Sequence, residues 1–181
     1  SSPAGKAAAG PPNQIDNRPI PIALQRAGVG QVRGAGLLIG VVSDTHGYLN
    51  PRVPYLLRGV DHILHAGDIG DDTIIVELAR IAPISAVRGN NDREGPTSLY
   101  PLEATVVLGD CRLLLTHEMK VPKLPDDPKV QGFREDGVQV VVFGHSHIAL
   151  QQQLGPVLFF NPGAAGKRRF KVVPSIGLLE L

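Results

Sequence analysis

Residues 37–47 read LLIGVVSDTHG, and this stretch decides the fold. Its first seven residues form a continuous apolar run, which is typical of a strand buried on both faces. The polar end of the run carries Asp44 and His46. If the backbone stays extended, alternate side chains point the same way, so both can face one ligand. We therefore expect a buried strand that ends in two potential metal ligands.

The same theme recurs twice further along the chain. DHILHAGD (61–68) and PISAVRGNND (83–92) each combine a short apolar run with Gly and a polar cluster. Between them, DDTIIVELAR (71–80) is acidic at its start and basic at its end, which complements a helix dipole, and Asp71 or Asp72 is a candidate cap. This β–α–β–α–β alternation predicts a largely parallel sheet.

The second half of the chain has a different pattern. ATVVLGDCRLLLTHE (104–118) has two apolar runs joined by Gly-Asp, which indicates a hairpin. GVQVVVFGHSH (137–147) predicts another buried strand, and 148–163 and 170–181 predict short strands. Residues 121–136 are interpreted as a loop with one short helix. We expect an α/β fold with two sheets, one for each half of the chain.

Residues 1–36 differ from the remainder in composition. They are rich in Gly, Pro and Ala and show no sustained helical or strand period, so we interpret them as an arm or linker. The domain proper is predicted to span residues 37–181. An ordered arm needs a surface to lie on, either on its own domain or on a second subunit. A homodimer is compatible with this arm.

Composition narrows the protein class. The chain is 43% hydrophobic and 19% charged with a net charge of +1, so it demands neither a membrane nor a long nucleic acid as a partner. Cys111 is the only cysteine, which rules out an internal disulfide and sites built on several thiolates. No run approaches the roughly 20 apolar residues of a membrane span, and no secretory leader is evident. We expect a soluble, cytoplasmic domain.

Polar residues gather where the predicted strands end. Ligands of open α/β sheets bind beyond the carboxyl ends of the strands. Five such ends are present: SDTHG (43–47), HAGD (65–68), GNND (89–92), THE (116–118) and GHSH (144–147). Imidazole and carboxylate groups suit divalent metals where thiolates are absent. The candidate ligands are Asp44, His46, Asp68, Asn90, His117, His145 and His147.

Seven ligands are too many for one tetrahedral ion but suit two ions that share a carboxylate. Two divalent cations also outweigh the charge of two aspartates, so the site would attract an anionic phosphate ester. Four glycines flank the candidate ligands and keep the nearby backbone thin: Gly47, Gly67, Gly89 and Gly144.

The series D-x-H, G-D, G-N-x-[HDE], H and G-H-x-H resembles the calcineurin-like metallophosphoesterase superfamily. With GNND and NPG (161–163), the chain most resembles the compact prokaryotic phosphodiesterases of that superfamily. The resemblance covers about residues 37–181. It implies a four-layer α/β/β/α sandwich of two mixed sheets, with a dinuclear site between the sheet edges.

The resemblance also implies how the ligands are shared. Asp44, His46, Asp68 and His147 would hold one ion, and Asp68, Asn90, His117 and His145 would hold the other. The implied reaction is in-line attack on phosphorus by a metal-bridging hydroxide. We expect manganese to support activity in vitro, although iron, cobalt, nickel and zinc suit the same ligands.

Asn91 stands where many monoester-hydrolysing relatives have a His that protonates the leaving oxygen. An amide cannot act as an acid at neutral pH, so we expect a small phosphodiester or nucleotide-like substrate with a good leaving group. Asp68, Asn91 and Asp92 are assigned to catalysis. Asp92 either orients a ligand or makes a turn. The predicted substrate contacts are Asn90, Asn91 and Gly163.

Other residues near the motifs keep two interpretations. His65 either supports the site or packs and bonds to the backbone. Glu118 either is a surface residue or narrows the site, and Arg168 and Arg169 either reach substrate or face solvent.

Three other functions compete with the phosphodiesterase. One is a phosphomonoesterase or nucleotide phosphatase at the same site. Another is a non-catalytic protein-binding scaffold of the same fold, which the seven metal-competent residues disfavour. A nuclease acting on long nucleic acid would need a broad basic surface or a capping domain, and the sequence shows neither.

Overall fold

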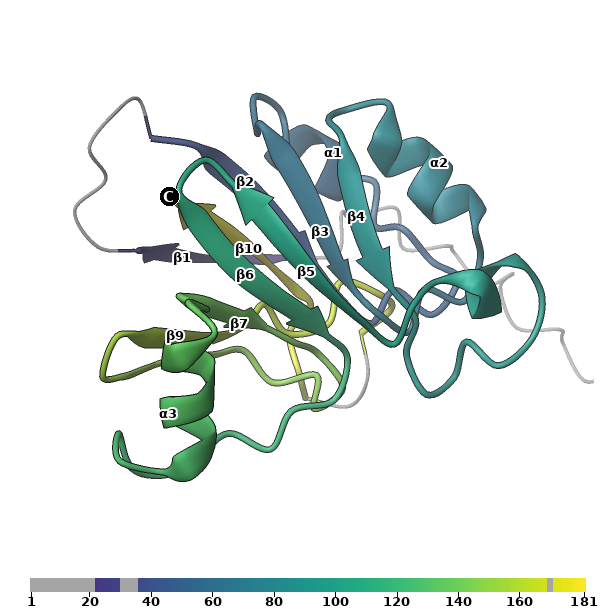
Figure 1. The fold of residues 1–181 in the computed structure, drawn as a ribbon. Coiled ribbons are helices and arrows are strands. Elements are labelled where there is room, and N and C mark those ends of the chain that lie inside the picture. Colours follow the sequence, from purple (N-terminus) through teal and green to yellow (C-terminus); the bar gives the residue numbers. More distant parts are fainter. Residues whose placement is uncertain (1–21, 30–35, 169–170) are drawn as a thin grey trace, which may run out of the picture.

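The computed structural model describes residues 22–29, 36–168 and 171–181 (Figure 1). These residues form two five-stranded sheets. In spatial order, the first sheet contains β1 (Ala23–Gly28), β10 (Ser175–Glu180), β2 (Leu38–Val42), β3 (His62–Ala66) and β4 (Ile84–Val87). The second contains β5 (Glu103–Leu108), β6 (Cys111–Thr116), β7 (Val140–Val142), β9 (Val157–Asn161) and β8 (Leu150–Leu154). The short helices are α1 (Val53–Leu56), α2 (Thr73–Ala79), α3 (Pro128–Glu135) and the 3-10 turn η1 (Pro96–Leu99).

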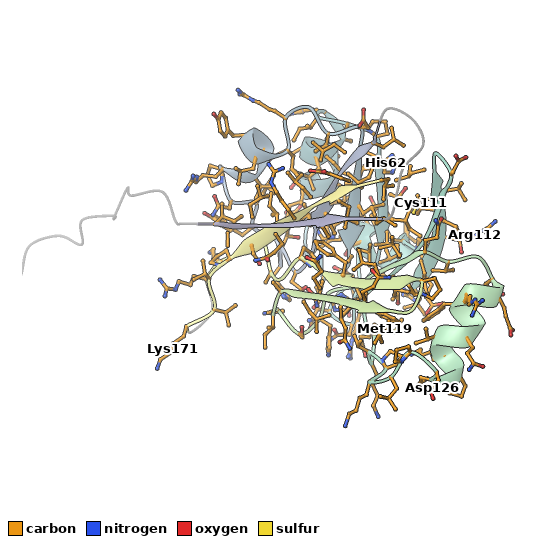
Figure 2. All side chains as sticks on the ribbon, turned by 90° about the vertical axis from the view of Figure 1, so that its left-hand side faces the viewer. His62, Cys111, Arg112, Met119, Asp126 and Lys171 are labelled. Carbon is orange, nitrogen blue, oxygen red and sulfur yellow. The ribbon has the colours of Figure 1, made fainter. Side chains whose placement is uncertain are left out.

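The sheets and helices stack as four layers, α/β/β/α, as the resemblance implies. In Figure 1, α1 and α2 cover the outer side of the first sheet and α3 covers the outer side of the second. A quarter turn away, in Figure 2, Asp126 lies beside α3 and Lys171 projects from the opposite end of the molecule. Both sheets mix parallel and antiparallel pairs, so the predicted fold class is confirmed.

Three apolar clusters fill the three interfaces between the layers. Val41 and Phe160 meet between the two sheets. Val42, the next residue of β2, points the other way and packs with Leu78 of α2. Phe159 likewise turns from Phe160 toward α3. Because neighbouring strand residues face opposite sides, a strand between two apolar layers needs an unbroken apolar run. This requirement explains LLIGVVS and VLFF.

The strands that carry the motifs run side by side. β2, β3 and β4 are parallel, as predicted, and their carboxyl ends lie at the same edge of the first sheet. β6 and β7 are also parallel, and the hairpin of β5 and β6 turns at Gly109-Asp110 as predicted. The arrowheads of β3, β4 and β6 point toward the same side in Figure 1. The topology therefore gathers the strand ends.

The prediction of one sheet for each half of the chain is wrong for β10. This C-terminal strand inserts into the first sheet, where it pairs antiparallel with β2. Its outer neighbour is β1, which pairs with it in parallel from Ala23↔Ser175 to Gly28↔Glu180. The sequence pattern missed β1 because ALQRAG is an edge strand with a mixed, largely uncovered pattern.

The pairing of β1 with β10 gives part of the predicted arm a surface within its own chain. The ordering of β1 therefore requires no second subunit, and the homodimer stays a prediction. Residues 1–21 and 30–35 of the arm lie outside the described residues. No described helix has the length and apolar character needed to cross a membrane.

Candidate metal centre

Three of the predicted ligands form a first cluster at the end of β2. Asp44, His46 and His147 bring their ligand atoms within 4.8 Å of one another. The Nε2 atom of His147 lies 3.2 Å from Asp44 Oδ1 and 3.2 Å from His46 Nε2. Asp44 is fully buried, whereas the two histidine side chains remain about one-fifth exposed. The cluster has the chemistry of a divalent-cation site that opens to solvent.

The other ligands form a second cluster at the ends of β3, β4 and β6. Asp44, Asp68 and His117 have ligand atoms within 4.8 Å of one another. His117 Nε2 lies 3.4 Å from Asp68 Oδ2. Asn90 Oδ1 lies 3.1 Å from His117 Nε2 and 3.0 Å from His145 Nδ1. All seven predicted ligands are therefore brought together, in two adjoining groups.

Asp44 and Asp68 connect the two groups. His46 Nε2 of the first cluster lies 3.8 Å from Asp68 Oδ2 and 3.9 Å from Asp44 Oδ1. The two clusters of close ligand atoms share Asp44. Asp68 Oδ2 lies near His46 of one and His117 of the other, so both aspartates stand between the two groups.

The surroundings of Asp44 Oδ1 show whether these residues suit metal ions. Asp44 Oδ2 accepts hydrogen bonds from Ser43 Oγ (2.7 Å) and the His145 backbone N–H (3.1 Å). Asp44 Oδ1 is buried and has no hydrogen-bond partner among the described residues. Burying a carboxylate oxygen without a partner is costly unless a cation sits beside it. The oxygen faces two histidines, so the donor set fits a divalent ion.

His117 is held with Nε2 toward the centre. Its Nδ1–H donates to the carbonyl of Ala66 at 2.7 Å, which orients the ring as a backbone carbonyl does for many metal-bound histidines. Burial lowers the pKa of His117, but its contacts with Asp68 and Ala66 outweigh this effect and the net pKa is raised. Burial raises the pKa of Asp68, yet the contact with His117 and hydrogen bonds from Asn91 bring it well below the usual range. Asp68 is therefore an anion ready to bind cations.

The ligand loops have unusual backbone geometry. Five non-glycine residues of the described chain have positive φ, between 48° and 67°, and all five are predicted ligands: Asp44, His46, Asp68, His145 and His147. The expectation of an extended Asp-Thr-His segment is thus wrong. β2 ends at Val42, and the ligands follow in left-handed turns that aim their side chains. Such strain concentrates at functional sites.

Gly89 and Gly144 let other segments approach the ligands closely, as predicted. A Cβ at Gly89 would collide with Asp68 Oδ1 and the Asp68 backbone. A Cβ at Gly144 would lie 2.6 Å from Asp44 Oδ2 and would collide with Ser43. Only a residue without a side chain fits at either position.

Asp92 joins two ligand loops without touching the ligands' donor atoms. Its carboxylate accepts the backbone N–H groups of Ile69 (3.0 Å), Gly70 (2.9 Å) and Gly89 (2.8 Å). It thereby fixes the loop after Asp68 to the loop before Asn90. This geometry fits the orienting interpretation of Asp92.

The sequence analysis did not predict two sets of hydrogen bonds that hold the loops of the candidate ligands. Thr45 Oγ1 donates to the Ile69 carbonyl (2.9 Å) and lies 3.0 Å from His65 Nε2, so His65 supports the loop between Asp44 and His46. Asn161 Nδ2 donates to the Gly144 carbonyl at 2.8 Å and holds the GHSH loop. Alternation of β3 could have placed His65 on the face opposite Leu64, but the partners depend on tertiary structure.

The remaining predicted residues lie around the centre. Asn91 donates to both oxygens of Asp68. Gly163 is buried, and its N–H donates to Asn161 Oδ1, so this amide is engaged within the loop. Glu118 and Asn90 line one pocket, and Arg168 lines a small one beside His147. Arg169 lies outside the described residues.

Comparisons with known proteins agree with this architecture, which is that of a metal-binding α/β sandwich. The model of the calcineurin-like phosphoesterase superfamily domain matches residues 37–181. The chain belongs to the calcineurin-like phosphoesterase superfamily, a family of metal-dependent phosphoesterases.

Named relatives support this membership, and a solved structure shares the fold. A probable metallophosphoesterase of Methanothermobacter thermautotrophicus is 32% identical over 155 residues, covering 80% of this chain and 86% of the relative. A phosphodiesterase of Methanocaldococcus jannaschii is 26% identical over 159 residues, covering 78% and 92%. A mutant Vps29 from Entamoeba histolytica has the same fold, with a TM-score of 0.65 and 22% identity over 80% of this chain and 86% of that chain.

Proposed function

We propose that this chain hydrolyses small, nucleotide-like phosphodiesters at a dinuclear metal centre, in the cytoplasm. The observation that carries the proposal is the junction of the two ligand clusters through Asp44 and Asp68. A single tetrahedral ion would leave three of the seven ligands without a role. A relative that is named a phosphodiesterase supports the choice of reaction.

The proposed ligand sets are those that the family resemblance implies, and the proximity of the seven side chains supports them. Asp44, His46, Asp68 and His147 would hold one ion, and Asp68, Asn90, His117 and His145 would hold the other. Two divalent ions, manganese in our proposal, would supply an activated water at neutral pH and offset the negative charge of the ester. The chain contributes by fixing the donor atoms before any substrate arrives.

The identity of Asn91 favours a diester over a monoester as the substrate. Its side-chain amide donates to Asp68 Oδ2 at 2.6 Å, and the residue is exposed to solvent. An amide donates a hydrogen bond but no proton, so Asn91 stabilises a carboxylate and does not protonate a leaving group. Esters whose alcohol leaves as a stable anion need no such proton, and aryl or strained diesters belong to that class.

The test compares bis(para-nitrophenyl) phosphate with para-nitrophenyl phosphate. The protein is stripped with EDTA and reloaded with manganese, and kcat/KM is measured for both esters. We expect the diester to react faster, and His145→Ala to lower this rate by at least about 100-fold. His62→Ala is a matched control, because His62 begins β3, at the end opposite Asp68, and contacts Ser85.

A monoester rate well above the diester rate would instead favour the phosphomonoesterase or nucleotide phosphatase. Metal-dependent turnover of neither ester would favour the scaffold, which has one supporting observation in the fold shared with Vps29. The family membership and the complete ligand set place the enzyme first.

A further inference from the structure

A pocket of about 650 Å³ opens beside the second ligand cluster. Asn90 and His117 form part of its wall, so it is continuous with the metal centre. It lies between the loop that follows β4 and the adjoining ends of β5 and β6, which contribute Glu103 and Thr116. This volume is within the usual range for small-molecule sites. One substituent of a bound phosphodiester would extend into this space.

The pocket contains both positive and negative side chains. Arg88 and Arg93 provide two positive charges, and Asp92, Glu103 and Glu118 provide three negative ones. Asp92 is buried and its carboxylate is bound by three backbone amides, whereas the two glutamates are exposed. The lining is therefore not positively charged overall. A second phosphate, which prefers an excess of Arg and Lys, would meet two carboxylates here.

Both arginines are tethered to the protein from one side. Arg93 Nε donates to the Asn90 carbonyl at 2.8 Å, so this guanidinium sits next to a metal ligand. Arg88 Nη1 donates to the Ser98 carbonyl at 3.3 Å. The buried Nε of Arg88 has no hydrogen-bond partner among the described residues. The tethered groups supply donors, and Glu103 and Glu118 supply acceptors.

The pocket also has an apolar side. Leu102 lines it and is 61% exposed, although it is a large hydrophobic residue. A ring that packs against Leu102 would remove this apolar surface from water. Donors, acceptors and an apolar face within one pocket match a ring system that carries hydroxyl and amide groups.

We propose that this pocket binds one substituent of the diester and selects an uncharged, hydrogen-bonding group such as a nucleoside. Glu103 and Glu118 accept its hydroxyl or amide protons and disfavour a further phosphate. Arg93 donates to its carbonyl or hydroxyl oxygens. This specificity rests on the proposed phosphodiesterase function and adds to it the pocket that selects one substituent of the diester.

The test uses two chromogenic esters that differ by one phosphate. Thymidine 5′-(para-nitrophenyl phosphate) is compared with its 3′-phosphorylated form in the manganese-loaded enzyme. We expect a roughly tenfold lower kcat/KM for the phosphorylated ester, which corresponds to a charge repulsion of about 1.4 kcal/mol at short range. In E103Q/E118Q we expect the ratio of the two kcat/KM values to fall to about threefold or less, mainly because the phosphorylated ester reacts faster.

Glu77→Gln provides the matched control, because Glu77 is an exposed carboxylate on α2 and does not line the pocket. It should leave the ratio of the two esters unchanged. An E103Q/E118Q ratio equal to that of the wild type overturns the assignment of the pocket. So does a wild-type preference for the phosphorylated ester.

Binding to the metal-free protein separates this inference from the function. Thymidine and thymidine 3′-monophosphate are titrated while the NMR signals of Arg93 Nε–H and the Glu118 amide are followed. We expect thymidine to shift both signals at lower concentration than the monophosphate. Turnover of bis(para-nitrophenyl) phosphate with no such shift would reject the pocket and keep the phosphodiesterase. Shifts without turnover of any ester would keep the pocket and reject the phosphodiesterase.

Discussion

Asn91 holds both oxygens of Asp68: its backbone N–H donates to Oδ1 at 2.8 Å and its side-chain amide donates to Oδ2 at 2.6 Å. Hydrogen bonds to a charged acceptor are the stronger kind. These two bonds favour the ionised carboxylate and contribute to the low pKa of Asp68. The residue proposed to set the substrate preference therefore also prepares the carboxylate that is proposed to bridge the two ions.

Asn91→His should change the balance between the two ester types. An imidazole in place of the amide can protonate a leaving oxygen, and general acid catalysis contributes roughly 100-fold or more. We expect the ratio of monoester to diester kcat/KM to rise by at least about tenfold. Asn91→Ala, which removes the amide without adding an acid, should slow both esters. An unaltered ratio in Asn91→His would disprove the role of Asn91 in substrate preference.

Removing one ligand from each cluster should reduce the metal content stepwise. Wild-type protein equilibrated with manganese should hold about two ions per chain, and His147→Ala and His117→Ala should each hold about one at the same free concentration, since each loses one ligand of its set. Mass spectrometric metal analysis after dialysis measures this content. His62→Ala should retain the wild-type value. A wild-type content of one ion would contradict the dinuclear centre.

Gly89→Ala should damage both the centre and the fold. The added Cβ would collide with Asp68 Oδ1 and with the Asp68 backbone, so the loop or the carboxylate must move. We expect a loss of about 2–4 kcal/mol in the free energy of unfolding and of most manganese binding. The matched control is Gly132→Ala in α3, where the new Cβ has no described atom within 4 Å apart from its chain neighbours and the backbone of its own helix. The free energy of unfolding of that variant should rise by about 0.5–1 kcal/mol. Urea unfolding compares the two, and equal stabilities would refute the steric argument.

His65 should make the fold less stable in mild acid. Burial lowers the pKa of His65 to about 4 from the ordinary 6.5, so the unfolded chain takes up a proton at a pH where the folded chain does not. Stability is therefore unaffected by this group above about pH 6.5 and decreases as the pH falls toward 4, by about 3 kcal/mol in total. Urea unfolding in EDTA at about pH 7.5 and about pH 4.5 measures the loss. His65→Gln keeps a donor for Thr45 and should lose less stability over this interval; a loss equal to the wild type would argue against the role of His65.

The sequence predicted the strands whose own residues form an apolar run. β2, β3 and β7 lie between two apolar layers, so each had to be an apolar run, and the polar residues after them marked the centre. β1 carried no such signal, because its one partner among the described strands is β10, about 150 residues away. The position of β10 in the first sheet was missed for the same reason: Ser175–Glu180 contains nothing local that selects β2 over the second sheet as its neighbour.

The candidate ligands could be predicted from the sequence, but their backbone geometry could not. Residue type and position after a strand singled out seven residues that the fold brings together, but the expected extended backbone at Asp44 and His46 was wrong. Their positive φ results from hydrogen bonds to distant segments, such as the His46 N–H to the Asp68 carbonyl at 2.9 Å. The three amides that bind Asp92 are likewise set by the packing of two loops. Contacts of this kind appear only once the chain is folded.

The place of β1 has a consequence for how the protein is made. On the ribosome, Ala23–Gly28 emerges before every other described strand, whereas its partner β10 is the last described strand to be synthesised. Until then β1 and the open side of β2 have no neighbour in the first sheet, and exposed strand edges invite pairing with other chains. Nascent chains would thus carry this vulnerability from the synthesis of β1 until β10 has emerged, about 150 residues later.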